Sequence, residues 1–310
     1  MYGYIGDQSG RGESNSRCRT PSAACYHYTT PRNHPILVFY HLPLYNFVVK
    51  LISLNTWGGK YFDLLVEFIK DYSSDTDIYC LQEIYYTTSN ITQYKNIMRV
   101  GLLDELKKAL PGFQVFYFPT LRGYDDEANP VGFHLSHGPA IFVKKSLTII
   151  SHQDYIINKA DPNFGPKKDF SNLTTPLQYI RLIYNGKQYS IFNFHGNPFP
   201  SNKLDSENRI KESGKVRDIV SGKENPKIIV GDFNLLPETK SLTIIGEGMR
   251  NLIREYNIER TRSNLSPFFG KEDFQKFADY TFVTNDVIVK NFQVPEVEIS
   301  DHLPMILEFD

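Results

Sequence analysis

Short apolar runs, each followed by a polar stretch, recur from residue 48 to the end of the chain and constrain the fold more than any other feature of the sequence. Short runs of β-branched, aromatic and apolar residues between turn-forming residues are typical of buried strands. Such runs predict strands at residues 48–54, 77–81, 114–118, 140–143, 177–184, 188–194, 227–230, 280–284, 287–292 and 305–309. Apolar residues at helical spacing predict helices at residues 61–69, 102–110 and 206–220.

The predicted strands and helices interleave irregularly, and the last strands follow one another as hairpin-like pairs. A chain of 310 residues is long enough to bury a large core. This pattern predicts an α/β fold, a four-layer sandwich of two mixed β-sheets that pack face to face and are flanked by helices. Residues 48–310 are expected to form one domain, in which the polar stretches at 120–136, 153–175 and 259–276 are loops.

The first 47 residues do not share this pattern. Residues 1–33 contain no Lys and no Leu, and neither a helical nor a strand period fits them. The run from Ser9 to Arg32 resembles the translation of a transfer-RNA gene read on the opposite strand. Residues 35–47 are apolar, but prolines interrupt them and they are too short for a transmembrane helix. We expect residues 1–47 to be an extension outside the domain, either a mis-called start or a disordered tail, with a targeting tail as the alternative. No stable membrane insertion is expected.

Charge and cysteine content limit the partners and the compartment. The 34 Lys and Arg residues against 35 Asp and Glu residues give a net charge of −1. Proteins that hold nucleic acid by bulk electrostatics need a surplus of positive charge, whereas a small cleft that binds phosphate through a metal ion does not. The cysteines Cys18, Cys25 and Cys80 show neither a disulfide framework nor zinc-ligand spacing. A reducing compartment fits this content, so we expect a cytoplasmic monomer, with secretion as the alternative.

Polar motifs stand where apolar runs end. They are Leu54-Asn55-Thr56-Trp57, Leu81-Gln82-Glu83, Asn193-Phe194-His195-Gly196, Gly231-Asp232-Phe233-Asn234 and Ser300-Asp301-His302. Each motif alone is weak, since an isolated Asp or Asn after a strand is usually a turn or cap residue. The ends of core strands can nevertheless hold polar groups rigidly beside a cleft, so the whole set predicts one site.

The residue types in these motifs suit metal-assisted phosphate chemistry. Mg²⁺ prefers oxygen ligands, and Glu83 with Asn55 supplies such a pair, to which Asp301 could add a carboxylate. The imidazoles of His195 and His302 can stabilise phosphate charge or transfer protons near neutral pH. The motifs therefore predict a divalent cation, Mg²⁺ or Mn²⁺, beside a pair of histidines.

The ordered motifs resemble those of the endonuclease/exonuclease/phosphatase superfamily, which includes DNase I, abasic-site endonucleases, neutral sphingomyelinases, deadenylases and inositol-polyphosphate phosphatases. The resemblance spans residues 48–309 and adds a motif at Ala278-Asp279-Tyr280-Thr281-Phe282-Val283. It implies a DNase I-like fold and two sets of site residues. The implied metal ligands are Asn55, Glu83 and Asp301, and the implied catalytic residues are His195, Asp232, Asn234, Asp279 and His302.

The resemblance also implies a role for each catalytic residue. Asp232 would orient or deprotonate the attacking water, and Asn234 would hold the phosphate. Asp279 would hold the imidazole of His302, which would contact a phosphoryl oxygen or transfer a proton. His195 would contact the phosphate or help to protonate the leaving group. The identity of the general base and the number of metal ions stay open at this point.

Some positions depart from parts of the superfamily. The residues after Asn55 are not acidic as they are in abasic-site endonucleases, and His195 stands where those enzymes have a tyrosine-containing motif. These differences favour the branches of DNase I, the sphingomyelinases and the deadenylases. Phe277-Ala278 precedes Asp279 where many relatives have an Arg, so one structural or phosphate-binding contact is expected to be missing.

The expected function is hydrolysis of a phosphodiester bond by an activated water, with a nucleic acid as the substrate. One alternative keeps the hydrolase but takes a phospholipid head group or a small phosphate ester. Another is an inactive phosphate-binding module, which the presence of Glu83, Asp232 and His302 disfavours. A basic strip or stacking groove would favour nucleic acid, and exposed apolar loops would favour lipid. The phenylalanines in residues 268–274 could stack on a base, contact lipid or pack within their loop.

We expect a chain that begins at Val48 to keep the fold and activity of the full chain, because residues 1–47 lack the periodic pattern that a packed core requires. Circular dichroism, thermal melting and hydrolysis rates compare the two chains directly. Loss of the cooperative melt or of activity in the shorter chain would show that the extension is part of the working fold.

Overall fold

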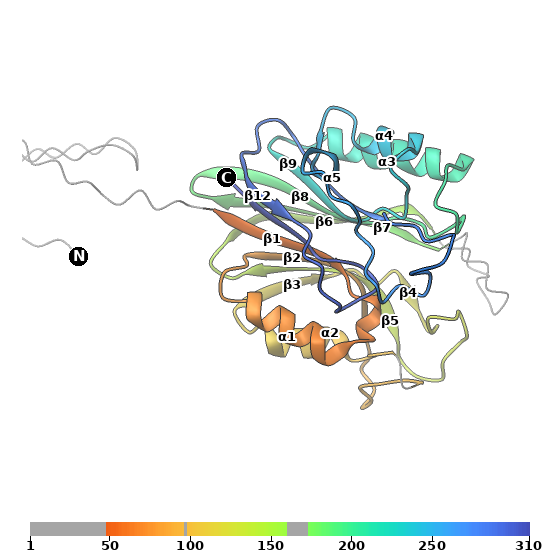
Figure 1. Cartoon of the computed structure of the whole chain (residues 1–310). Helices are drawn as coiled ribbons and strands as arrows, with labels where there is room; N and C mark the ends of the chain where they lie inside the picture. The colour runs from red at the N-terminus through yellow and green to blue at the C-terminus, as the bar shows by residue number, and fades with distance from the viewer. Residues whose placement is uncertain (1–47, 96–97, 160–172) are drawn as a thin grey trace, which may run out of the picture. The chain divides into compact units, whose positions relative to one another are not determined.

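Two mixed β-sheets lie at the centre of the structure, a computed structural model that describes residues 48–95, 98–159 and 173–310 (Figure 1). The first sheet has the spatial order β12 (Val289–Gln293), β13 (Met305–Phe309), β1 (Val49–Asn55), β2 (Ile78–Tyr86), β5 (Ser136–Lys144) and β3 (Phe113–Tyr117), with β4 (Leu121–Arg122) beside β5. The second has the order β10 (Arg250–Asn251), β11 (Asp279–Val283), β9 (Lys227–Asp232), β8 (Lys187–His195), β7 (Thr175–Tyr184) and β6 (Thr148–Asn158). The expected extension at residues 1–47, with Cys18 and Cys25, lies outside the described residues.

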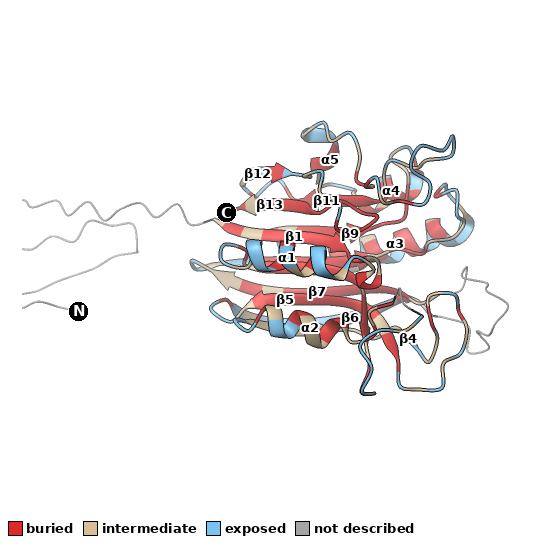
Figure 2. Ribbon diagram, turned by 60° about the horizontal axis from the view of Figure 1, so that its bottom comes forward, coloured by how far each residue is buried: buried red, intermediate tan, exposed pale blue. Residues whose placement is uncertain are grey.

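Helices cover the outer face of each sheet. The first sheet carries α1 (Phe62–Tyr72) and α2 (Leu102–Ala109), and the second carries α3 (Glu207–Ser221), α4 (Lys240–Ile245) and α5 (Leu252–Glu255). The short 3-10 helix η1 (Trp57–Gly59) follows β1. Figure 2 shows that the strands are largely buried, while α1, α2 and α3 each carry buried and exposed residues, as amphipathic helices do. The predicted four-layer α/β sandwich is therefore confirmed. Within the described part of the chain, no helix has both the length and the apolar character needed to cross a bilayer.

The alternation of side chains along β1 explains how the first sheet serves two cores. Leu51 joins the cluster of buried side chains between the sheets, whereas Ile52 and Leu54 join the cluster beneath α1 and α2. Successive residues of a strand point to opposite faces, so a strand buried on both faces must be apolar throughout. The continuous apolar run at residues 48–54 meets this requirement, and the strand ends where Asn55 begins the polar site.

Buried amide side chains connect the two sheets. Asn193 on β8 accepts a hydrogen bond from Gln82 Nε2 on β2 at 2.6 Å and donates to the carbonyl oxygen of Leu81 at 3.1 Å. Its Nδ2 also donates to Gln178 Oε1 on β7 at 3.3 Å, and Gln178 donates to the carbonyl oxygen of Phe116 on β3 at 3.1 Å. We call Gln82, Gln178 and Asn193 the amide cluster. These side chains are fully buried, so water cannot replace their hydrogen bonds. The hydrogen bonds form only when the first sheet packs on the second in one relative position.

The predicted elements agree with the structure except at two places. Strand β2 does not end at Leu81, because it continues to Tyr86 across a bulge. Residues 153–158 are not a loop but the second half of β6. β6 is an edge strand whose side chains are mostly exposed, so its polar sequence hides the strand period. The sequence also does not predict the first half of β6 or the short elements β4, β10, α4 and α5. The predicted loop at 259–276 contains no helix or strand.

We predict that Asn193→Leu lowers the free energy of unfolding by about 2–4 kcal/mol, because it leaves buried partners on both sheets without a hydrogen bond. Gln188→Leu is the matched control on the same strand, since Gln188 is exposed and should change stability by less than about 0.5 kcal/mol. Urea denaturation of both variants measures the difference. Equal stabilities would mean that the amide cluster does not couple the sheets.

Candidate active site

Neighbouring strands of the second sheet place His195, Asp232 and Asp279 side by side at one edge of the sheet. β8 and β9 run parallel, so both end at this edge, and their last residues His195 and Asp232 are paired. β11 runs antiparallel to β9 and begins here, which places Asp279 opposite Asp232. The structure therefore brings together three side chains that the sequence predicts to be functional.

Gly231 permits the close packing of β8 and β9 at this level. Its φ is +136°, and a Cβ atom at this position would stand 2.0 Å from the carbonyl oxygen of Phe194. Backbone would have to move to relieve such a contact, so a side chain here would push the strands apart. The glycine thus holds Asp232 in register with His195.

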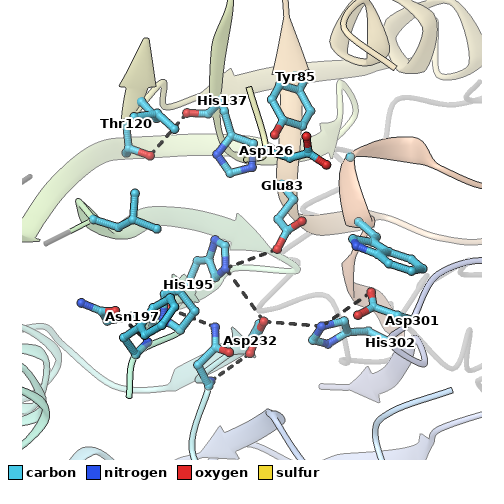
Figure 3. Close-up of a pocket in the computed structure, with 18 of the residues that line it drawn as sticks. Glu83, Tyr85, Thr120, Asp126, His137, His195, Asn197, Asp232, Asp301 and His302 are labelled. Carbon is cyan, nitrogen blue, oxygen red and sulfur yellow. Dashed lines mark hydrogen bonds and ion pairs between the residues drawn. The ribbon is translucent and has the colours of Figure 1, made fainter. Parts of the chain in front are cut away.

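Glu83 reaches the site because β2 bulges. Gln82 and Glu83 together stand opposite a single residue of β5, between the pairs Leu81–Ala140 and Ile84–Gly138. Gln82 points into the amide cluster, whereas Glu83 has a φ of +60° and turns its carboxylate into the cavity (Figure 3). A bulge re-aims a side chain in this way at a local cost in backbone strain. The expectation that Glu83 stands at a strand end is wrong, since it lies within β2.

The side chain of Asn55 joins carboxylates from the two sheets. Its Nδ2 donates to Glu83 Oε1 at 3.0 Å and to Asp232 Oδ2 at 3.0 Å. Its Oδ1 accepts a hydrogen bond from the backbone N–H of Trp57 at 3.0 Å. In this arrangement Asn55 orients the two carboxylates, and its role as a metal ligand stays a prediction.

His302 is fixed by a carboxylate, as the sequence predicts. Its Nδ1 lies 2.8 Å from Asp279 Oδ2, and its Nε2 lies 3.6 Å from Asp232 Oδ2. The loop that carries it is held by Ser300, whose Oγ donates to the Asn55 carbonyl oxygen at 2.7 Å and accepts from the His302 N–H at 3.3 Å. The imidazole is therefore oriented from two sides and points toward Asp232.

The charges around Asp232 and His302 set their protonation states. Burial raises the pKa of the Asp232 carboxyl, but the positive charges around it, His302 first, lower that pKa to about 2. Burial and the charge of Arg262 lower the pKa of His302. The carboxylates of Asp279, Asp301 and Asp232 act in the opposite direction and raise this pKa to about 9. At neutral pH the pair is therefore a carboxylate beside an imidazolium.

A cavity of about 400 Å³ is lined by Glu83, His195, Asp232 and His302 (Figure 3). Asn55 and Asp279 contact these lining residues but do not line the cavity themselves. Asp232 and His302 lie at one end, Glu83 lies in the middle, and Tyr85 and Asp126 lie at the other end. A cavity of this size holds a small phosphate ester, and one end of it carries the groups suited to phosphate chemistry.

Lys203 and Arg262, cationic residues that the sequence analysis does not single out, also line the cavity, as does Lys60. Arg262, from the loop at 259–276, donates from Nη1 to Asp301 Oδ2 at 2.8 Å. Lys203 donates from Nζ to the carbonyl oxygen of Pro198 at 3.0 Å and to Asn234 Oδ1. Burial lowers the pKa of Lys203 to about 8, although Asp232 opposes this shift. Arg262 supplies a guanidinium beside the site although the expected position before Asp279 lacks one.

Asn234 and Asp301 are both held by protein contacts. Asn234 Nδ2 donates to the carbonyl oxygen of Gly196 at 3.0 Å, and its backbone N–H donates to Asp232 Oδ1 at 2.9 Å. Asp301 accepts from Arg262 through Oδ2. Both residues line the cavity, and their roles in phosphate and metal binding stay predictions.

The oxygen donors at Glu83 suit a hard divalent cation. Its Oε1 accepts from Asn55, while Oε2 has no hydrogen-bond partner among the residues that the structure describes. Burial raises the pKa of Glu83, but the neighbouring imidazoles, His195 first, and the Asn55 hydrogen bond lower it overall. An ionised carboxylate with a free oxygen facing a cavity is a fitting ligand for Mg²⁺ or Mn²⁺.

A second group of possible ligands consists of Asp232, Asp279 and His302, whose donor atoms lie within 4.8 Å of one another. The His302 Nδ1 atom already pairs with Asp279, and the imidazole carries a proton at neutral pH. A protonated imidazole repels a cation, and the metal site at Glu83 stays a prediction.

The chain is similar to known proteins in sequence profile and in fold. The profile of the Endonuclease/Exonuclease/phosphatase family matches residues 52–302. No curated protein matches the chain in a direct sequence search.

Among solved structures, a protein of the endonuclease/exonuclease/phosphatase family from Bacteroides thetaiotaomicron has a TM-score of 0.61 at 19% identity, covering 85% of this chain and 95% of that chain. The mannosyl-6-phosphatase Bt3783 of Bacteroides thetaiotaomicron has a TM-score of 0.58 at 19% identity, covering 84% and 99%. The D. rerio TDP2 in complex with a single-strand DNA product has a TM-score of 0.57 at 15% identity, covering 85% and 99%. These likenesses support the fold.

We predict that His302→Ala and Asp232→Asn each lower kcat by at least about 10²-fold and change KM much less, since both groups face the reacting centre. Asp279→Asn should cost less, because the imidazole stays in place and loses only its orienting carboxylate. Steady-state kinetics beside thermal melts separate chemistry from folding. A His302→Ala variant with near-wild-type kcat on every cleaved substrate would refute the assignment.

Proposed function

The chain belongs to the endonuclease/exonuclease/phosphatase family of metal-dependent phosphoric ester hydrolases, and we propose that it cleaves the ester bond of a small phosphate compound with an activated water and Mg²⁺ or Mn²⁺. The observation that carries this proposal is the row of Asp232, Glu83 and His195 along one cavity of about 400 Å³. Carboxylates and imidazoles so arranged can position water, charge and leaving group on one phosphate.

Distinct tasks fall to Asp232, His302, His195 and Glu83 in this proposal. Asp232 is ionised and takes the proton of the attacking water. His302, held by Asp279 and cationic, donates a hydrogen bond to a phosphoryl oxygen. His195 Nε2 lies 3.9 Å from both Glu83 Oε1 and Asp232 Oδ2, within reach of a phosphate held between them, and in this proposal it protonates the leaving oxygen. Glu83 would hold the divalent cation, which would supply charge neutralisation for the phosphoryl group.

The charges near the cavity favour a small substrate over a nucleic-acid duplex. Lys60 pairs with Asp126 at 3.7 Å, and Lys95 pairs with Asp125 at 2.6 Å, so these lysines are neutralised by neighbouring carboxylates. A duplex site needs unpaired positive charge along a groove. The similar Bacteroides thetaiotaomicron protein named a mannosyl-6-phosphatase supports a small phosphate ester as the substrate class.

Cleavage of single-stranded nucleic acid is the second candidate. The similar D. rerio TDP2 holds a single-strand DNA product, and one strand needs less positive charge than a duplex. Phe268 and Phe269 are 52% and 46% exposed, but neither lines the cavity, and Phe269 packs edge to face on Phe274 at 5.4 Å. Stacking on these rings therefore adds no contact at the reacting centre.

We predict that turnover stops in excess EDTA and returns with Mg²⁺ or Mn²⁺, measured with 4-nitrophenyl phosphate, bis(4-nitrophenyl) phosphate, sugar phosphates and single-stranded DNA. Glu83→Gln should raise the metal concentration for half-maximal activity by at least about 10-fold, because it removes the charge of the principal ligand. Glu127→Gln is the control, because Glu127 is an exposed carboxylate near the same cavity. Full activity after dialysis against EDTA, or hydrolysis of none of these esters, would contradict the proposal.

A further inference from the structure

The end of the cavity beyond Glu83 carries polar side chains that the proposed chemistry does not use. Asp126 lines the cavity, and its Oδ1 is buried without a hydrogen-bond partner among the described residues. Its other oxygen lies 3.7 Å from Lys60 Nζ. A buried carboxylate oxygen without a partner is costly, so such an atom marks a place where a ligand donor can bind.

Tyr85 and His137 stand beside Asp126 at this end (Figure 3). Their rings pack at 4.6 Å, and both residues line the cavity. Tyr85 is buried and His137 is half-buried, and in the part of the chain that the structure describes neither the Tyr85 hydroxyl nor the His137 imidazole makes a hydrogen bond, so both can bind a ligand in the cavity. We call Tyr85, Asp126 and His137 the distal subsite.

The position of the distal subsite relates it to the leaving group. Asp232 lies at the opposite end of the cavity, with Glu83 between them (Figure 3). In an in-line displacement the leaving oxygen departs on the side of the phosphorus opposite the attacking water. If Asp232 holds that water, the alcohol part of the ester points toward the distal subsite.

We propose that the distal subsite binds hydroxyl groups of the departing alcohol, so that the substrate is a phosphate ester of a polyhydroxylated ring, a sugar or a cyclitol. This inference rests on the proposed function and names its substrate class. A carboxylate oxygen accepts from a ligand hydroxyl, while a phenol and an imidazole can each donate or accept, which is the set that adjacent ring hydroxyls require.

Other occupants fit this end less well. Burial lowers the pKa of His137 to about 4, so the imidazole is neutral and suits an uncharged partner. A quaternary ammonium group binds on an aromatic face, but Lys60 Nζ already lies 4.1 Å from the centre of the Trp57 ring. Lys60 Nζ covers the same face of the Trp57 ring, so a nucleic-acid base cannot stack on it.

The test compares kcat/KM on mannose 6-phosphate and myo-inositol 1-phosphate with kcat/KM on 4-nitrophenyl phosphate, which has no ring hydroxyls. Asp126→Asn should lower kcat/KM on the sugar and cyclitol esters by at least about 10-fold and on the nitrophenyl ester by less than about 2-fold. Tyr85→Phe removes only a hydroxyl and should lower kcat/KM on the sugar and cyclitol esters by about 3- to 10-fold.

Two controls separate recognition from packing. Lys60→Gln breaks the ion pair with Asp126 and keeps the Asp126 carboxylate. The ratio of kcat/KM on the sugar and cyclitol esters to kcat/KM on 4-nitrophenyl phosphate should therefore change by less than about 2-fold. Glu127→Gln alters a neighbouring carboxylate outside the cavity lining and should leave the ratio unchanged. Equal losses of Asp126→Asn on both ester classes overturn the inference while hydrolysis itself stands. Absence of hydrolysis of every ester overturns the proposed function together with the inference.

Discussion

The side-chain amide of Asn55 is the contact on which the site depends, because it donates to carboxylates that belong to different sheets. Glu83 lies on the first sheet and Asp232 on the second, and each accepts from Asn55 Nδ2 at 3.0 Å. A slide of one sheet over the other would break at least one of these hydrogen bonds. The amide cluster resists that slide from within the core, since its hydrogen bonds also cross between the sheets. Catalytic geometry here follows from sheet packing, and the loops add to it.

The same arrangement divides the charges of the site into two groups. Asp232 has cationic neighbours in His302, Lys203 and Arg262, so its negative charge is already balanced by the protein. Glu83 lies farther along the cavity, where the protein provides the neutral amide of Asn55 at 3.0 Å and no ammonium or guanidinium within ion-pair distance among the described residues. A buried carboxylate without a fixed positive partner is stabilised by a bound cation. This charge balance agrees with the proposed mechanism, in which Glu83 would hold the metal and Asp232 would act on water.

The sequence predicts those parts of the site that depend on strand order and fails where they depend on contacts between distant segments. Asn55 and His195 follow long buried runs, and such a run ends at the edge of a sheet wherever it lies in the chain. Glu83 is misplaced because its position depends on a bulge against β5, which the sequence of β2 alone does not reveal. Lys203 and Arg262 come from irregular segments, and only the folded chain brings them to the cavity. The distal subsite is hidden for the same reason, since its residues come from β2, β5 and the loop between β4 and β5.

A gradient of polarity along the inward faces of the strands explains why core and site can share the same strands. On β8, Asn193 belongs to the amide cluster, and His195, two residues later on the same face, lines the cavity. On β1, Leu51 packs between the sheets and Asn55, four residues later, binds the carboxylates. The face of β8 thus passes from apolar side chains through an amide to an ionisable group, and the face of β1 passes from an apolar side chain to an amide. The amides isolate the charged groups from the apolar core, and they are neutral, so they orient the charged groups without changing the charge balance that sets the protonation states of Asp232 and His302.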